Sequence, residues 1–169
     1  MQENRNLPMA IIAEGIKKGY PLPGGDTFWA LKGVDLEIPK GKLTILRGRS
    51  GSGKTTLMNI LGALDVPTEG GVIFRTEGDK GIALQEISEA ERTSLRRTSI
   101  GYVFQSVALI PMMTARENVE FALRMARYTG DRDQRVRECL ELVGLSARAE
   151  HMPAQLSGGE QQRVAIARA

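Results

Sequence analysis

The sequence feature that most constrains this 169-residue chain is a glycine-rich octapeptide, Gly48-Arg49-Ser50-Gly51-Ser52-Gly53-Lys54-Thr55. It matches the pattern G-x-x-x-x-G-K-[S/T] at every fixed position. Glycines let the backbone curl so that several N–H groups point inward at an anion, and a helix that follows adds the positive end of its dipole. The octapeptide therefore predicts a strand, a phosphate-binding loop and a helix, which favours an α/β fold.

The residues on either side of the octapeptide favour this interpretation over an ordinary glycine-rich turn. Leu43 to Leu46 is a short apolar run, which predicts a strand leading into the loop. After the loop, apolar residues recur at the spacing of one helix face, and Pro67 should end that helix. These apolar residues are Leu57, Ile60, Leu61 and Leu64.

The residues of the octapeptide have distinct expected roles. All of them, from Gly48 through Thr55, are expected to line the phosphates of a nucleotide. Lys54 should carry a mobile positive charge to the β and γ phosphates, which makes it a catalytic candidate as well. The Thr55 hydroxyl can ligate Mg²⁺, and Thr56 is a further hydrogen-bond donor.

Periodicity and turn residues predict the remaining strands. Val34 to Ile38 alternates apolar and acidic residues, as a half-buried strand does. Prolines and glycines between Pro21 and Gly25 indicate a loop before it. The other expected strands are Met9 to Ile16, Val72 to Phe74, Ile82 to Leu84 and Ile100 to Phe104, the last of them buried.

Three capping boxes and one glycine predict the helices. A Ser or Thr followed three residues later by Glu marks a helix start. This pattern occurs at Ser88 and Glu91, at Thr114 and Glu117, and at Ser157 and Glu160. A further helix is expected from Asp133 to Val143, with Gly144 in a left-handed cap position.

The composition indicates a packed domain and argues against a nucleic-acid binder. Hydrophobic residues make up 41% of the chain, whereas the net charge is only +3 and aromatic residues amount to 5%. No apolar run approaches the roughly 20 residues that span a bilayer. The start, Met1 to Pro8, is polar and has no signal-peptide pattern. We therefore expect a cytoplasmic protein whose membrane contact, if any, comes through a partner.

A second motif, Leu156-Ser157-Gly158-Gly159-Glu160-Gln161-Gln162, lies near the end of the chain. A capping box explains Ser157 and Glu160 but not the two glycines, which weaken a first helical turn. Small residues at a helix N-terminus let backbone donors approach an anion. With both motifs the chain resembles the ATP-binding cassette (ABC) ATPase family, whose signature motif Leu156 to Gln162 matches.

The resemblance covers Met9 to Ala169 and implies an architecture. This is an α/β fold with a RecA-like P-loop NTPase core, an antiparallel β subdomain and an α-helical subdomain. Residues 9–106 would form the β subdomain and P-loop core, and residues 107–165 the helical subdomain with the signature motif.

The resemblance also implies ATP and Mg²⁺ as cofactors and assigns two single residues. Gln105 matches the family's Q-loop glutamine, a catalytic candidate that ligates Mg²⁺ or water and acts as a hinge. Tyr20 matches the aromatic residue that stacks on adenine. Phe28 or Trp29, which lie nearby in the sequence, could instead pack on the base or belong to the core.

In this family two nucleotide-binding subunits form a head-to-tail dimer. The signature of one subunit then contacts the nucleotide that the other subunit's P-loop holds. The residues expected to make this contact are Ser157, Gly158, Gly159 and Gln161.

Several stretches resemble the export-type subgroup that releases lipoproteins or drives macrolide efflux. They are Asn59 to Gly70, Ile100 to Gln105, Leu109 to Pro111 and Glu117 to Val119. The subgroup implies an integral membrane permease as partner, and so a place at the inner face of the cell membrane. Arg49 departs from the small residue or proline that is usual at its position.

In the family, the strand with the Mg²⁺-supporting aspartate and the catalytic glutamate follows the region that ends here at Ala169. We therefore expect an incomplete domain without its C-terminal core strands, which binds nucleotide weakly and does not hydrolyse ATP alone. Two alternatives stay open. One is a degenerate regulatory module without hydrolysis. The other is a soluble ABC ATPase of DNA repair or translation, although the coiled-coil insertion or second cassette typical of that group is not seen.

Overall fold

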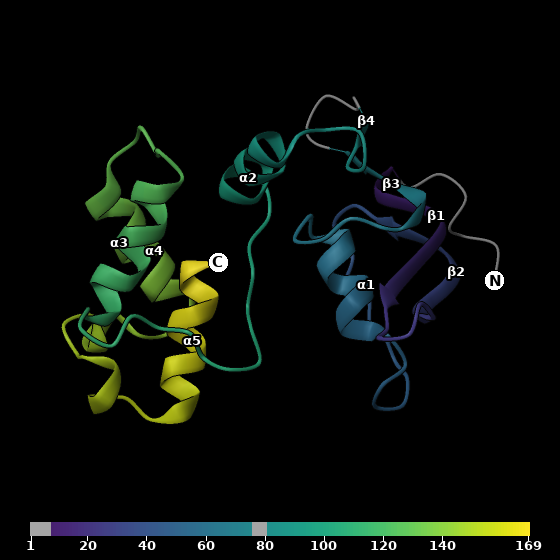
Figure 1. Ribbon diagram of the computed structural model, residues 1–169. Helices are drawn as coiled ribbons and strands as arrows, with labels where there is room; N and C mark the ends of the chain where they lie inside the picture. Colours follow the sequence, from purple (N-terminus) through teal and green to yellow (C-terminus); the bar gives the residue numbers. More distant parts are fainter. Residues whose placement is uncertain (1–7, 76–80) are drawn as a thin grey trace. The chain divides into compact units, whose positions relative to one another are not determined.

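The computed structural model describes residues 8–75 and 81–169, which divide after Arg96 into two compact units (Figure 1). The polar start of the chain, apart from Pro8, lies outside the described residues. Among the described residues no helix is long and apolar enough to cross a bilayer. The boundary that we expect between a β and a helical subdomain, at residues 106 and 107, stays a prediction.

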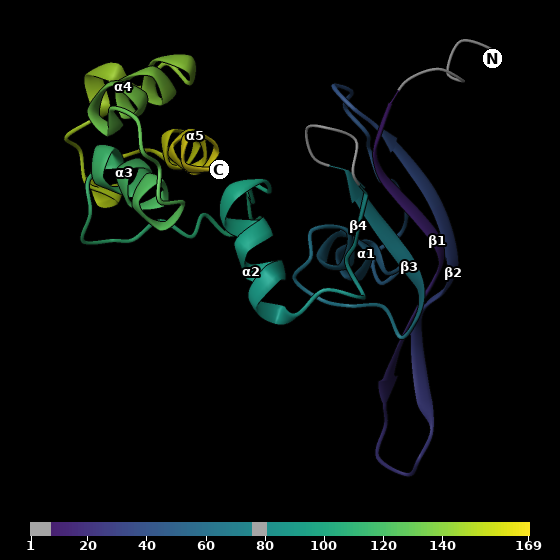
Figure 2. The ribbon, with the colours of Figure 1, turned by 90° about the horizontal axis from the view of Figure 1, so that it is seen from above.

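The first unit is built on a four-stranded antiparallel sheet in the order β2-β1-β3-β4. Its strands are β1 (Met9–Pro21), β2 (Thr27–Pro39), β3 (Glu69–Arg75) and β4 (Gly81–Ala83). β1 and β2 form a long curved hairpin (Figure 2). A strand was expected within each of these four regions, but β1 and β2 are longer than predicted because each pairs with the other along the whole hairpin.

The helix α1 (Lys54–Leu61) lies on one face of this sheet, against β1 and β2 (Figures 1 and 2). Its predicted apolar face is correct for Leu57, Ile60 and Leu61, which are buried, whereas Leu64 lies beyond the helix and is exposed. Ile60 of α1 and Ile16 of β1 are both fully buried. This burial is what fixes the helix that follows the octapeptide to the sheet.

Two predicted strands are wrong. Leu43 to Leu46 and Ile100 to Phe104 adopt no strand, and the side chains of Leu43 and Ile45 are 89% and 70% exposed. Val103 and Phe104 are also exposed. An apolar, β-prone run becomes a strand only where another strand pairs with it, and no strand within residues 8–75 and 81–169 pairs with either segment.

The second unit is helical. It contains α3 (Ala115–Met125), α4 (Arg132–Leu142), the short 3-10 helices η1 (Ser146–Arg148) and η2 (Pro153–Gln155), and α5 (Gly158–Arg168). The helix α2 (Glu89–Thr98) spans the division between the units. Buried apolar side chains from α3, α4, α5 and the segments that connect α4 to α5 form one core: Ala115, Val119, Val136, Leu140, Leu145, Leu156 and Val164.

The predicted helix starts are confirmed in atomic detail. Thr114 and Ser157 each accept a hydrogen bond from the backbone N–H three residues on, and Glu117 and Glu160 each accept one in return. At the start of α2 the Glu91 backbone N–H donates to the Ser88 hydroxyl, 3.3 Å away. Gly144 has φ 69°, the left-handed conformation expected of a helix-ending glycine.

We expect Gly70→Ala to destabilise the first unit more than any other single methyl addition in the sheet. Gly70 has φ 84°, and a Cβ there would collide with the backbone oxygens of Glu14 and Gly15 in β1. Left-handed backbone costs a residue with a side chain about 1–3 kcal/mol, and the collision adds to that. Thermal unfolding followed by circular dichroism should therefore show a loss of at least about 3 kcal/mol.

Gly24→Ala is the matched control for this prediction. Gly24 also has a positive φ of 106°, but a Cβ there meets nothing within 4 Å. This variant should lose only about 1 kcal/mol, which is the backbone cost alone. Equal losses in the two variants would show that the contact between β1 and β3 does not depend on Gly70.

Candidate functional site

The glycine-rich loop has the geometry of an anion cradle. Gly51 and Gly53 adopt φ 78° and 85°, conformations that bend the backbone ahead of α1. Gly53 is the N-cap of α1 and supplies no side-chain cap, and the first turn of the helix has no acidic residue. Unpaired N–H groups and the positive helix dipole therefore face the loop without a competing carboxylate. These residues fit a phosphate group.

The Lys54 side chain folds over this loop. Its Nζ donates to the carbonyl oxygens of Gly48 and Arg49, 2.8 and 2.7 Å away. The Ser52 hydroxyl lies 3.4 Å from the same nitrogen. An ammonium that rests on neutral carbonyls can exchange them for phosphate oxygens, which are stronger acceptors because they are charged. Thr55, the predicted Mg²⁺ ligand, is exposed at the first turn of α1.

Gly53 also brings the loop against the hairpin. A Cβ on Gly53 would lie 2.7 Å from the Ala30 carbonyl oxygen and 2.8 Å from the Leu31 side chain, so the loop backbone sits directly on β2. Leu31 pairs with Lys18 of β1. This packing was not predictable from the octapeptide, in which Gly53 appears only as a requirement of the loop.

The same register places the predicted base-stacking residue near the loop. Tyr20 pairs with Phe28, two residues before Ala30 along β2. Two residues span about 7 Å along a strand, so the aromatic pair lies within the length of a nucleotide from Gly53. The Tyr20 side chain is 40% exposed and Phe28 is 55% exposed, whereas Trp29 is half-buried. Tyr20 and Phe28 are therefore both exposed, whereas Trp29 is less so, and the stacking of Tyr20 on adenine stays a prediction.

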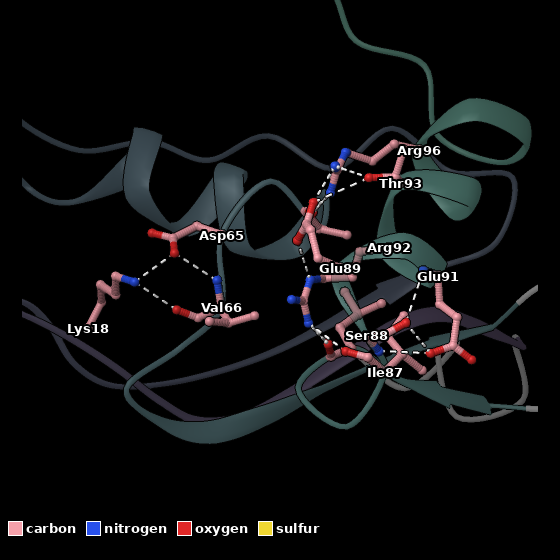
Figure 3. A network of polar contacts seen from close by, with 12 residues as sticks. Lys18, Asp65, Val66, Ile87, Ser88, Glu89, Glu91, Arg92, Thr93 and Arg96 are labelled. Atoms are coloured by element: carbon pink, nitrogen blue, oxygen red, sulfur yellow. Dashed lines mark hydrogen bonds and ion pairs between the residues drawn. The ribbon is translucent and has the colours of Figure 1, made fainter. Parts of the chain in front are cut away.

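The opposite end of α1 is held by cations from two elements (Figure 3). Lys18 of β1 donates to the carboxylate of Asp65 and to the carbonyl of Val66, just after α1. Arg96 of α2 donates to the Ala63 carbonyl. Positive charge at a helix C-terminus complements the helix dipole. Arg96 and Arg92 also bond Glu89, which lowers the pKa of that carboxyl to about 2.

The signature motif lies at the N-terminus of α5. Ser157, Gly158 and Gly159 are exposed there, and a Cβ on Gly158 would meet nothing within 4 Å. The Ser157 backbone and hydroxyl donate to the Glu160 carboxylate, and with Arg148 they lower the pKa of Glu160 to about 2. The motif therefore combines open small residues with a carboxylate that stays ionised.

Gln161 has a structural use in addition to any role at a nucleotide. Its side-chain amide donates to the carbonyl oxygens of Pro153 and Leu156, 2.9 and 3.1 Å away. These bonds fasten the turn before the signature to α5. The direct contact of Gln161 with ATP stays a prediction.

Gln105 is exposed in an irregular segment of the second unit. Its shared Mg²⁺ role with Thr55 of the first unit stays a prediction.

Asn118 of the second unit is a structural residue that sequence reasoning missed, and it is fully buried. Its amide accepts from the Ile110 backbone and donates to the Met113 carbonyl, 2.9 Å away, so it orders the loop before α3. The one sequence signal for Asn118 was its place between Glu117 and Val119, in a stretch that resembles the export-type subgroup.

A glycine-rich loop that opens a helix against a sheet defines the class of P-loop nucleotide-binding domains. The chain belongs to the ABC transporter family, whose family model matches residues 31–169. The family confirms the resemblance inferred from the two motifs and identifies the chain as an ABC transporter ATP-binding domain.

Individual relatives agree with this membership. The lipoprotein-releasing system ATP-binding protein LolD of Bordetella pertussis is 43% identical over 170 residues, which cover 100% of this chain and 71% of LolD. The macrolide export ATP-binding/permease protein MacB of Wolinella succinogenes is 44% identical over 94% of this chain and 24% of MacB. Both names belong to the export and release subgroup expected from the sequence.

A solved structure confirms the fold class. The dimeric, post-hydrolysis state of the ATP-binding cassette MJ0796, bound to ADP and Pi, aligns with a TM-score of 0.80 at 43% identity. The alignment covers 94% of this chain and 68% of that one. The α/β architecture with an antiparallel sheet and a helical part is therefore that of an ABC ATPase cassette.

Proposed function

We propose that this chain is the ATP-binding subunit of an ABC transporter that couples ATP binding and hydrolysis to substrate export or release through a membrane permease. The observation that carries the proposal is the N-terminus of α1, where curled glycines, unpaired N–H groups and the Lys54 ammonium converge without an acidic side chain. The names of LolD and MacB support the direction of transport. In this proposal the chain lies at the cytoplasmic face of the membrane through its permease.

Different residues would contact different parts of the nucleotide. The loop from Gly48 to Thr55 and Thr56 would hold the phosphates, with Lys54 on the β and γ phosphates. Tyr20 would stack on the adenine. Mg²⁺, held by Thr55 and Gln105 with phosphate oxygens, would neutralise charge that develops on the transferred phosphoryl group.

A second copy of the chain would complete the site. Ser157, Gly158 and Gly159 are exposed in the described structure, so their backbone donors are open to an anion from outside their own unit. In a head-to-tail dimer that anion is the γ-phosphate on the other subunit's loop. The dimeric state of the MJ0796 cassette supports this arrangement.

The proposal predicts that ATP drives dimerisation. Size-exclusion chromatography with light scattering should give the mass of one chain without nucleotide or with ADP, and twice that mass with saturating ATP and Mg²⁺. With Mg²⁺ present in both samples, ATP and ADP differ only in the γ-phosphate, so a difference between these two samples would locate that group at the interface. A mass that stays monomeric under saturating ATP, with bound ATP demonstrated in the same sample, would contradict the composite site.

A further inference from the structure

Lys18 of β1 is held by two polar contacts. Its Nζ lies 2.7 Å from the Asp65 carboxylate and 2.8 Å from the Val66 carbonyl oxygen. Its side chain is only 13% exposed, and that of Asp65 is 30% exposed. Figure 3 shows the lysine reaching across to the segment that follows α1. The ammonium thus has a fixed position between β1 and the C-terminal end of α1. The phosphate loop lies at the N-terminal end of the same helix.

The same ammonium lies over the ring of Tyr20. The distance from Nζ to the ring centroid is 5.5 Å, within the range of a cation–π contact. This contact places Lys18 and Tyr20 on the same side of β1, although the pairing with β2 shifts between Lys18 and Gly19. With one face of the ring held by the ammonium, the other face is the one on which a planar base can stack.

The neighbouring residues tie this strand to the same segment. The Gly19 N–H donates to the Thr68 hydroxyl at 3.0 Å, and the Thr68 N–H donates to the Lys17 carbonyl at 2.8 Å. The side chains of Thr27 and Trp29 in β2 lie against Gly19, so there is no room for a Cβ at this position. The stretch that carries Tyr20 is therefore anchored to the segment between α1 and β3.

We propose that Lys18 is a positioning residue for the nucleotide base: anchored by Asp65 and Val66, it holds the Tyr20 ring in the orientation in which the base stacks. The inference rests on the proposed role of Tyr20 and deepens it. The ion pair connects the base-binding ring to the C-terminal end of α1, while the phosphates bind at the N-terminal end. A ring that is already ordered loses less conformational freedom when the nucleotide binds.

The test compares two ligands. ATP carries the base, whereas inorganic tripolyphosphate offers the same phosphate chain without base or ribose. Calorimetric titration of the full chain should show that Lys18→Met weakens ATP binding by roughly two- to tenfold, the cost of ordering one side chain. Tripolyphosphate binding should not change. Lys18→Arg should restore ATP affinity, because a guanidinium can pair with Asp65 and also stack on an aromatic face.

Lys17→Met is the matched control. Lys17, the neighbour of Lys18 in β1, forms an ion pair with Glu69 of β3, 2.6 Å away, whereas the ammonium over the Tyr20 ring is that of Lys18. This variant should bind both ligands as the original chain does. If Lys18→Met weakens both ligands equally, Lys18 supports the fold and does not position the base.

Tyr20→Ala separates this inference from the proposed function. It should weaken ATP binding by roughly 5- to 100-fold, the range of one lost base–aromatic stack, and leave tripolyphosphate unaffected. Adding Lys18→Met to Tyr20→Ala should then cost nothing more, because Lys18 acts through the ring. If Tyr20→Ala has no effect, the stacking role itself is wrong. If Tyr20→Ala weakens ATP binding and Lys18→Met does not, only the positioning role of Lys18 is wrong.

Discussion

Replacing Lys54 by alanine should lower the affinity for ATP about a hundredfold, a loss of about 3 kcal/mol in binding free energy. A hydrogen bond to a charged group is worth about 1.5–3 kcal/mol, and we expect Lys54 to reach two phosphates. In the described structure the ammonium bonds the carbonyls of Gly48 and Arg49. Those bonds are local to the loop, so the free energy of unfolding should change by less than about 1 kcal/mol. Titration with a fluorescent ATP analogue measures the first quantity, and thermal unfolding the second.

Arg49→Ala is the control for this prediction, since it removes a positive charge from the same loop at a variable position of the motif. Its guanidinium is exposed, and exposed charges are screened by salt, so ATP affinity should fall by less than about threefold. Equal losses in both variants would mean that the loop attracts the nucleotide by net charge alone. The specific role of Lys54 would then be wrong.

The local parts of the fold could be predicted because their causes are local. The capping boxes at Thr114 and Ser157 need only residues within one helical turn, and both form as expected. The left-handed conformation of Gly144 follows from its place after a helix. Alternation in Val34 to Ile38 likewise reflects one half-buried face of β2.

The parts that failed or were missed depend on residues far apart in the sequence. Leu43 to Leu46 has the composition of a strand, but no strand among the described residues pairs with it. Pairing is a property of the neighbouring chain, which local propensity does not contain. The contact of Gly53 with Ala30 could not be predicted either. The phosphate-loop pattern alone accounts for a glycine at position 53, so nothing in the sequence points to a second cause.

The candidate site shows the same division. Sequence reasoning identified the loop and the signature because each is a short motif with a mechanism. It could not find the bonds of Lys18 to Asp65 or of Asn118 to Ile110, since a lone lysine or asparagine has no pattern. Such residues become visible only when burial and partners are known.

Gly158→Asp should abolish ATP-dependent dimerisation without harming the fold of the single chain. Gly158 is the first residue of α5, it is exposed, and a Cβ there meets nothing within 4 Å. Acidic residues in a first turn gain about 0.3–1 kcal/mol from the helix dipole, which offsets repulsion from the ionised Glu160. In the dimer, however, the new carboxylate would meet the γ-phosphate of the other subunit, and opposed like charges cost several kcal/mol. Light scattering under saturating ATP should therefore give the mass of one chain.

Two controls make this result specific to the signature motif. Gly158→Ala adds size without charge and should weaken the dimer less than Gly158→Asp does. Arg132→Asp places a carboxylate at the first residue of a different helix, α4, where the side chain is also exposed, and should leave the dimer intact. Because the added charge lies on the signature and not on the loop, the Gly158→Asp monomer should bind ATP as tightly as the original chain does. Lys54→Ala, in contrast, should bind ATP about a hundredfold more weakly. A dimer that persists in Gly158→Asp would exclude the N-terminus of α5 from the interface.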